Sequence, residues 1–183
     1  MSQFSAVEGK LTLANFFKVE KDVYPVGRLD YDSEGLLLLT NDTRLNHRLL
    51  NPSFKHRREY WVQVEGTITP AAMIQLEQGV TISIDGKPYQ TLPAKGGVFM
   101  GAPPVPKREP PIRFRKNVPD GWISLELTEG KNRQVRKMTA AVGLPTLRLI
   151  RRSIEKLSIE GLGPGEMRSI STPDLYKALR IRL

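Results

Sequence analysis

Apolar and polar residues alternate with different periods along the chain, and these periods predict short strands mixed with helices. Residues 60–65 and 123–127 alternate in the manner of half-buried strands. Residues 131–142 place apolar side chains at a helical spacing and stop at Gly143. Further strands are predicted at residues 80–84, 87–91, 146–152, 155–159 and 166–170, and further helices at residues 13–18, 43–50, 71–78 and 173–179. This mixture predicts an α+β fold with one mixed, largely antiparallel sheet and flanking helices.

One stretch, residues 27–42 with the sequence GRLDYDSEGLLLLTND, combines an apolar core pattern with charge. Its four consecutive leucines, residues 36–39, are too few for an independent helix and suit a strand that is buried on both faces. Three acidic residues precede them in a chain that is otherwise basic: Asp30, Asp32 and Glu34. Carboxylates at the start of a core strand indicate a functional site there.

Turn-forming residues organise the middle of the chain. The pair Asp85-Gly86 predicts a tight hairpin between two short strands. Residues 102–119 contain six prolines, so we expect an extended loop there and not a helix. The loop also carries five basic residues: Lys107, Arg108, Arg113, Arg115 and Lys116.

The charge balance bears on the class of partner. The sequence has 28 Lys and Arg against 19 Asp and Glu, a formal net charge of +9. Such an excess favours a polyanionic partner, of which nucleic acid is the commonest, over a merely basic solvated surface. The absence of cysteine excludes disulfides, thiolate metal sites and cysteine nucleophiles. No apolar run approaches the roughly 18 residues that a membrane span needs, so we expect a cytoplasmic protein without membrane contact.

Three segments, in this order, resemble the motifs of one enzyme family. They are residues 27–42, residues 59–66 (EYWVQVEG) and residues 129–138 (EGKNRQVRKM). Together they are similar to the pseudouridine synthases that modify uridines of ribosomal RNA, and the similarity extends over roughly residues 4–172. The resemblance implies a pseudouridine synthase fold around a basic catalytic cleft. It also implies ribosomal RNA of the large subunit as the partner of a monomeric enzyme.

The same resemblance implies roles for individual residues. Asp30 would be the catalytic carboxylate, with Arg136 facing it and keeping it charged. The target base must leave the RNA stack before a carboxylate can reach its glycosidic bond. Arg28 would fill the space that the base vacates, and Tyr60 would stack on the extruded uracil. The reaction needs no cofactor and no metal.

RNA contacts are expected from two regions. Arg133 and Lys137 share a helical face with Arg136, and Lys131 precedes them. The proline-rich loop adds Arg113 and Arg115. Other interpretations remain for these residues: Tyr60 is also compatible with a core position, and the basic helical face with plain solvation. His47 and His56 fit surface or RNA-contacting positions better than catalysis.

Two other functions remain possible at this point. A catalytically silent RNA-binding or ribosome-assembly protein would keep the fold, but binding alone does not require a carboxylate in a basic cleft. A metal-dependent nuclease would use Asp30, Asp32 and Glu34 as ligands, but their spacing lacks the length of a calcium loop.

The start of the sequence departs from the family pattern. Members usually have a further strand with a Lys-Pro pair before residue 13, and often a small N-terminal RNA-binding domain; neither pattern occurs here. We therefore expect residues 1–183 to form a single catalytic domain without that first strand. An exposed sheet edge or a gap beside the Asp30 loop would follow.

Overall fold

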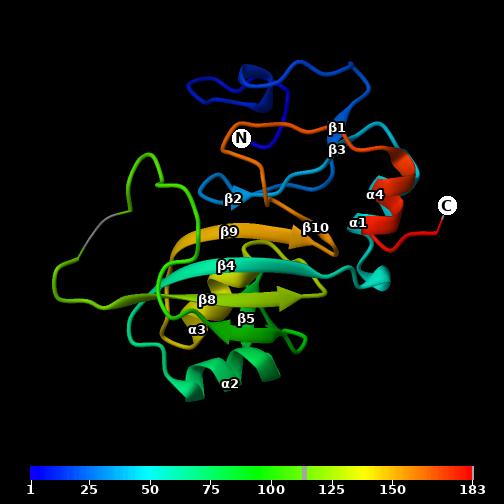
Figure 1. The fold of residues 1–183 in the computed structure, drawn as a ribbon. Coiled ribbons are helices and arrows are strands. Elements are labelled where there is room, and N and C mark those ends of the chain that lie inside the picture. Colours follow the sequence, from blue (N-terminus) through cyan, green and yellow to red (C-terminus); the bar gives the residue numbers. More distant parts are fainter. Residues whose placement is uncertain (113–114, 183) are drawn as a thin grey trace.

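The computed structural model describes residues 1–112 and 115–182 and is organised around a six-stranded sheet (Figure 1). The strand order is β10-β9-β4-β8-β7, and β2 pairs with β9. The β2–β9 pair is parallel and the other pairs are antiparallel, so the predicted mixed, largely antiparallel α+β fold is confirmed. The strands are β2 (Glu34–Gly35), β4 (Arg58–Glu65), β7 (Lys95–Val98), β8 (Asp120–Leu127), β9 (Thr146–Ile154) and β10 (Leu157–Ser158).

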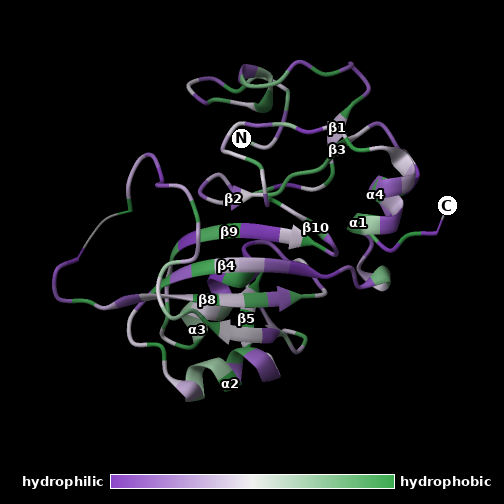
Figure 2. Ribbon diagram, viewed as in Figure 1, coloured by the Kyte–Doolittle hydropathy of each residue, from purple (hydrophilic) through white to green (hydrophobic). Residues whose placement is uncertain are grey.

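The first hydrophobic core lies against one face of the long strands. Val62 of β4 stands opposite Ile123 of β8 and Leu149 of β9, and all three side chains are buried. The helices α2 (Pro70–Gln78) and α3 (Gln134–Ala141) contribute Leu76 and Met138 to this core. The predicted hairpin is present as β5 (Thr81–Ile84) and β6 (Lys87–Gln90). Polar and apolar residues both occur along each long strand, as a sheet with two different faces requires (Figure 2).

A second core joins the two ends of the chain. It contains Leu45 and Leu49 of α1 (Thr43–Leu50), Tyr176 of α4 (Thr172–Ala178) and Ile154 of β9. The short pair of β1 (Tyr24–Pro25) with β3 (Leu39–Thr40) adjoins these helices (Figure 1). Because β9 contributes Leu149 to the first core and Ile154 to the second, this strand connects the two.

The prediction of one doubly buried strand for the four leucines is wrong. The run is divided between two sheets: the Leu36 amide donates to Arg151 O of β9, whereas Leu38 O accepts from the Val26 amide. Leu36 is buried, and the other three leucines are only partly so. The chain changes partners between Leu36, whose amide bonds to β9, and Leu38, whose carbonyl bonds to Val26.

Other expected elements differ from the structure where tertiary contacts are missing. Residues 13–18 form only the 3-10 helix η1 (Leu13–Asn15), which buries no residue, and Phe16 is exposed. Residues 166–170 are exposed and form no strand. The strand β7 was not predicted because Gly96 and Gly97 interrupt its apolar pattern. A second 3-10 helix, η2 (Pro52–Phe54), follows α1.

The first residues of the chain lie against the loop that precedes β2. The Ser2 hydroxyl donates to Leu29 O at 3.0 Å and accepts from Leu29 N at 3.1 Å. The Ser2 side chain therefore lies beside the loop, at a place where we expected an exposed sheet edge or a gap. Among the described residues, no helix is long and apolar enough to cross a membrane.

Asp42 links the first helix to the last, which gives a test of the second core. One carboxylate oxygen accepts from Leu45 N at 2.9 Å and the other from the Tyr176 hydroxyl, and these bonds, the Tyr176 bond first, lower the pKa of Asp42. Asp42→Ala should reduce the free energy of unfolding in urea by about 1–2 kcal/mol at neutral pH. Asp42→Asn should lose less, because its amide oxygen can still cap the helix.

The same contact predicts a pH dependence. A carboxyl with a lowered folded-state pKa stabilises the fold above its unfolded value of 3.8, and this contribution disappears as the pH falls through the folded value. The difference between wild type and Asp42→Ala should therefore shrink below about pH 4. Glu8→Ala, which removes an exposed carboxylate, serves as the control. A difference that is independent of pH would contradict this account.

Candidate active site

The loop that carries Asp30 is fixed at both ends by backbone geometry. Gly27 begins it with a φ of 71°, and the Asp30 carbonyl accepts from Ser33 N at 2.9 Å, which closes a turn. β2 then pairs with Ile150 and Arg151 of β9. A Cβ at Gly35 would lie 2.3 Å from Arg151 O, so only glycine permits this close approach. The loop is thus held against the edge of the sheet.

Two arginines of α3 and its preceding turn approach the Asp30 carboxylate. Arg133 Nη1 lies 3.7 Å from Asp30 Oδ2, and Arg136 Nε lies 4.0 Å from the same oxygen. Arg133 adopts a left-handed φ of 54°, so α3 begins at Gln134 and not at residue 131 as predicted. The expected contact between Arg136 and Asp30 is present. The contribution of Arg133 was not foreseen.

Asp32, not Asp30, is the principal hydrogen-bond partner of these arginines. Arg133 donates to both Asp32 oxygens at 2.9 and 3.1 Å, and Arg136 Nη2 donates to Asp32 O at 2.8 Å. The Arg133 hydrogen bond lowers the pKa of Asp32 and raises the pKa of Arg133. Burial lowers the pKa of Arg136. Within the described residues the Asp30 carboxylate accepts no hydrogen bond, so its oxygens are not committed to the protein.

The third acid of the loop is also engaged by arginine. Arg148 of β9 donates to both Glu34 oxygens at 2.9 and 2.7 Å, and Arg108 of the proline-rich loop lies 3.7 Å from Glu34. Each of the three acids that a metal-dependent nuclease would use as ligands, Asp30, Asp32 and Glu34, therefore has an arginine as its neighbour. The part of the chain that the structure describes contains no group of three or more potential metal ligands.

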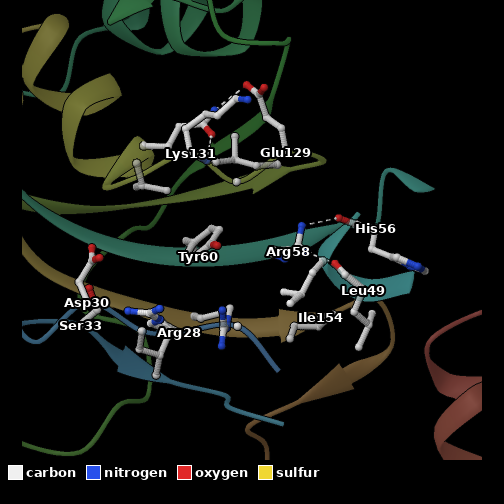
Figure 3. A pocket seen from close by; sticks show the side chains of 18 of the residues that line it. Arg28, Asp30, Ser33, Leu49, His56, Arg58, Tyr60, Glu129, Lys131 and Ile154 are labelled. Carbon is white, nitrogen blue, oxygen red and sulfur yellow. Dashed lines mark hydrogen bonds between the residues drawn. The ribbon is translucent and has the colours of Figure 1, made fainter. Parts of the chain in front are cut away.

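Asp30 and Tyr60 line the same cleft, whose volume is about 230 Å³. Figure 3 shows Asp30 and Ser33 at one end, His56 and Leu49 at the other, and Tyr60 with Arg28 between them. Arg28 is exposed, whereas Tyr60 of β4 is partly buried against the first core. The structure therefore brings three of the residues with predicted catalytic or substrate-binding roles, Asp30, Arg28 and Tyr60, to one cleft. The fourth, Arg136, does not line the cleft but approaches Asp30 from α3.

Of the residues predicted to contact RNA, some line the cleft and others lie outside it. Lys131 and Arg133 line the cleft, and the Lys131 ammonium lies 5.0 Å from the centre of the Tyr89 ring. Lys137 is on α3 but does not line the cleft. Arg115 is bound to Glu65 at 2.8 Å beside a separate small hollow. Arg113 lies outside the described residues.

Sequence reasoning missed Arg151, which lines the cleft together with Arg58 of the basic segment 55–58. His56 lines it too and is 7% exposed, so of its two expected positions, surface or RNA-contacting, the surface position is wrong. Burial lowers the pKa of His56, against the opposing effect of Glu155, whose oxygen lies 3.6 Å away. Arg58 could have been found from the alternation of β4, because it precedes Tyr60 by two residues, whereas the position of Arg151 depends on the pairing of β9 with β4. Opposite Tyr60 in the β9 register stands Arg151.

Comparison with known proteins defines the class. The RNA pseudouridylate synthase family matches residues 5–141, which include Asp30, Tyr60 and Arg136. The chain belongs to this family.

Individual relatives are named more specifically. Ribosomal large subunit pseudouridine synthase E of Vibrio vulnificus is 47% identical over 173 residues, which are 94% of this chain and 71% of the relative. The protein of the same name from Xanthomonas axonopodis pv. citri is 50% identical over 166 residues, 90% of this chain and 85% of the relative. A crystal structure of a pseudouridylate synthase superposes with a TM-score of 0.73 at 26% identity, covering 91% of this chain and 65% of that one.

The close approach at Gly35 allows a test of how the loop is held. Gly35→Ala would place a methyl group against the Arg151 backbone, which cannot move without breaking β9. We expect it to lower the free energy of unfolding by about 1–3 kcal/mol and to raise amide hydrogen exchange at Leu36, whose N–H bonds Arg151 O. Gly130→Ala is the control, since a Cβ there meets no atom within 4 Å. Unchanged protection of Leu36 would show that β2 is not anchored in this way.

Proposed function

We propose that this protein isomerises a uridine of large-subunit ribosomal RNA to pseudouridine, with Asp30 as its catalytic residue. The observation that carries the proposal is the position of Asp30. Its carboxylate lies within 4.0 Å of two arginines and shares a cleft with a tyrosine. Membership of the RNA pseudouridylate synthase family supports the reaction, and the names of the relatives support the substrate.

The chemistry requires a charged carboxylate with accessible oxygens. Two guanidinium groups lie within 4.0 Å of Asp30, and the absence of hydrogen bonds to its carboxylate from the described residues leaves the oxygens available. Asp30 would attack the target nucleotide or remove a proton from it. The N1–C1′ bond breaks, the uracil turns, and C5 is joined to C1′; C5 loses a proton and N1 gains one. The product is an isomer of the substrate, so the chemistry has no use for a group donor or an oxidant.

Access to the base would depend on the residues at the middle of the cleft. Arg28 is exposed beside Asp30 and could occupy the gap in the RNA stack once the uridine turns out. Tyr60 would then stack on the extruded uracil. Lys131, Arg133 and Lys137 would contact phosphates around the cleft. Arg115 could contribute only by giving up its bond to Glu65.

We further infer that one copy of the chain acts as a single catalytic domain in the cytoplasm, where it would meet ribosomal RNA. The shared strand β9 supports the single domain, because it belongs to both hydrophobic cores. We propose a monomer because a single chain can supply every residue named for the reaction, so the site as proposed requires none from a second copy.

Asp30→Asn tests the reaction directly. The substitution is nearly isosteric, so the turn to Ser33 should survive, but the side chain loses its negative charge and with it both nucleophilicity and basicity. We expect pseudouridine formation to become undetectable in a single-turnover assay on ribosomal RNA. RNA affinity should be kept or slightly increased, because an anion has been removed from a basic cleft.

Asp22→Asn is the matched control, since it removes an exposed carboxylate of the same kind outside the cleft. Conversion at the wild-type rate by the Asp30→Asn variant would refute the role of Asp30. If the well-folded wild type bound ribosomal RNA but converted no uridine in it, the catalytically silent RNA-binding protein would be the better description.

Tyr60 offers a second test. Tyr60→Phe keeps the ring and should retain stacking, whereas Tyr60→Leu should lose about 1–3 kcal/mol of base stacking and slow single-turnover conversion accordingly. Thermal unfolding of both variants controls for the packing of Tyr60 against the first core. Equal rates for the two variants at equal stability would argue against stacking.

A further inference from the structure

The arginines of the cleft fall into two groups that differ in their partners. Those near Asp30 are matched by carboxylates, as described for Arg133 and Arg136. Three others line the cleft without an ion pair to any described carboxylate: Arg28, Arg58 and Arg151. Arg28 is exposed and solvated, but Arg151 is only 6% exposed. The cleft therefore contains buried positive charge that the described part of the protein does not neutralise.

Arg151 is held rigidly by its backbone and by one side of its guanidinium group. Its Nε donates to Leu36 O at 2.7 Å, and its backbone pairs with β2. Its Nη2 is buried and has no hydrogen-bond partner in the described structure. Tyr60 lies opposite Arg151 on β4 and, as a neutral phenol, does not compensate its charge. The Nε donor of Arg151 is thus engaged, whereas its buried Nη2 group is not.

A second cation stands close to Arg151. Arg58 precedes Tyr60 by two residues, so both side chains project from the same face of β4. Its guanidinium donates to Leu49 O at 2.6 Å and His56 O at 3.2 Å, which orients the group without neutralising it. Burial and the charge of Arg58 both lower the pKa of Arg151. Arginine nonetheless stays protonated, so the repulsion persists in the free protein.

A buried cation without a counter-ion destabilises the fold, and an anion that enters the cleft would remove that cost. Uracil is neutral and cannot do so fully, whereas a phosphodiester carries a full charge and matches the planar donor array of arginine. If the uracil stacks on Tyr60 with its ribose near Asp30, the Arg58 end of the cleft remains for the neighbouring backbone (Figure 3).

We propose that Arg151, assisted by Arg58, forms a subsite for one backbone phosphate next to the target uridine. The inference rests on the proposed function, because it takes RNA as the substrate. The subsite fixes the extruded nucleotide from the side opposite Asp30. Recognition of a phosphate inside the cleft would make the enzyme select a turned-out nucleotide over a stacked one.

The test pairs protein variants with RNAs that lack one charge. The target uridine is first mapped, and ribosomal RNA fragments are then made with a single neutral methylphosphonate at each linkage that flanks it. Equilibrium affinity and single-turnover rate are measured for wild type and Arg151→Met. For wild type, a methylphosphonate at one of these linkages should lower the affinity or the single-turnover rate by about 10- to 100-fold, which is the effect of losing a charge-assisted hydrogen bond. For Arg151→Met the native RNA should show a similar loss, and the modified RNA at most about twofold more.

Arg152→Met is the matched control on the same strand. Arg152 stacks 5.0 Å from the centre of the Trp61 ring, pairs with Glu160 at 3.1 Å and does not line the cleft. This variant should keep the wild-type response to every methylphosphonate. Because Arg151→Met also loses the bond to Leu36, Arg151→Lys and Arg58→Met are measured in parallel. Each should reduce the response to the same linkage, which a loss of folding alone would not do.

Additive losses at every flanking linkage, in all three cleft variants, would overturn the subsite. The subsite would also be overturned if no methylphosphonate changed the affinity or rate of the wild-type enzyme. Arg151 would then be assigned to contact with the uracil. Failure of the proposed function is distinguishable, because wild type would then convert no unmodified RNA. The affinity measurements would still decide whether Arg151 and one phosphate interact.

Discussion

The candidate active site depends on a parallel pairing only two residues long. β2 contributes Glu34 and Gly35, and through them the Asp30 loop is attached to β9. So short a strand supplies little stability of its own. Side chains of β9 reinforce it from both directions: Arg151 Nε binds Leu36 O after the strand, and Arg148 binds the Glu34 carboxylate within it. The glycine at position 35 is what allows the two backbones to meet.

This attachment explains why neighbouring acids in one loop have different environments. Asp32 takes the bidentate bond from Arg133, and Glu34 takes that from Arg148, so both are structural partners of arginine. Asp30 receives the field of Arg133 and Arg136 at 3.7 and 4.0 Å without a hydrogen bond from either. A carboxylate stabilised at a distance keeps its lone pairs free, which a nucleophile or base requires. Asp32 thus aims the arginines that support Asp30.

Local sequence patterns predicted the elements whose stability is local. α1 begins after the Asp42 cap, α2 begins with Thr69 and Pro70, and the Asp85-Gly86 turn joins a hairpin. The leucine run was misjudged because its two partners, near residues 26 and 151, belong to different sheets, and the second is distant in the sequence. A run of apolar residues indicates burial, but it carries no information about which strand lies beside it. β7 was missed for the complementary reason, since Gly97 fits against Ser124 without an apolar signal.

The candidate site was predictable to a similar extent. Motif spacing led to Asp30 and Tyr60, which line one cleft, and to Arg136, which approaches Asp30 from α3. It could not reveal the pairing of Arg133 with Asp32, because that depends on the left-handed turn before α3. Nor could it separate His47, which is exposed, from the buried His56. The partner of an arginine and the burial of a histidine depend on tertiary packing, which a local stretch of sequence does not determine.

In a chain with a net charge of +9, the cationic side chains of the cleft therefore have different partners at its two ends. At the Asp30 end, arginines form ion pairs with acids of the loop, and these ion pairs orient the loop. At the other end, Arg58 is held by backbone carbonyls, and Arg151 by one carbonyl alone. Carbonyls orient a guanidinium group but leave its charge intact, so this end attracts anions more strongly than the end where arginines are paired with acids. A polyanion with a neutral base would be drawn in by its backbone at one end and would present the base to a free carboxylate at the other.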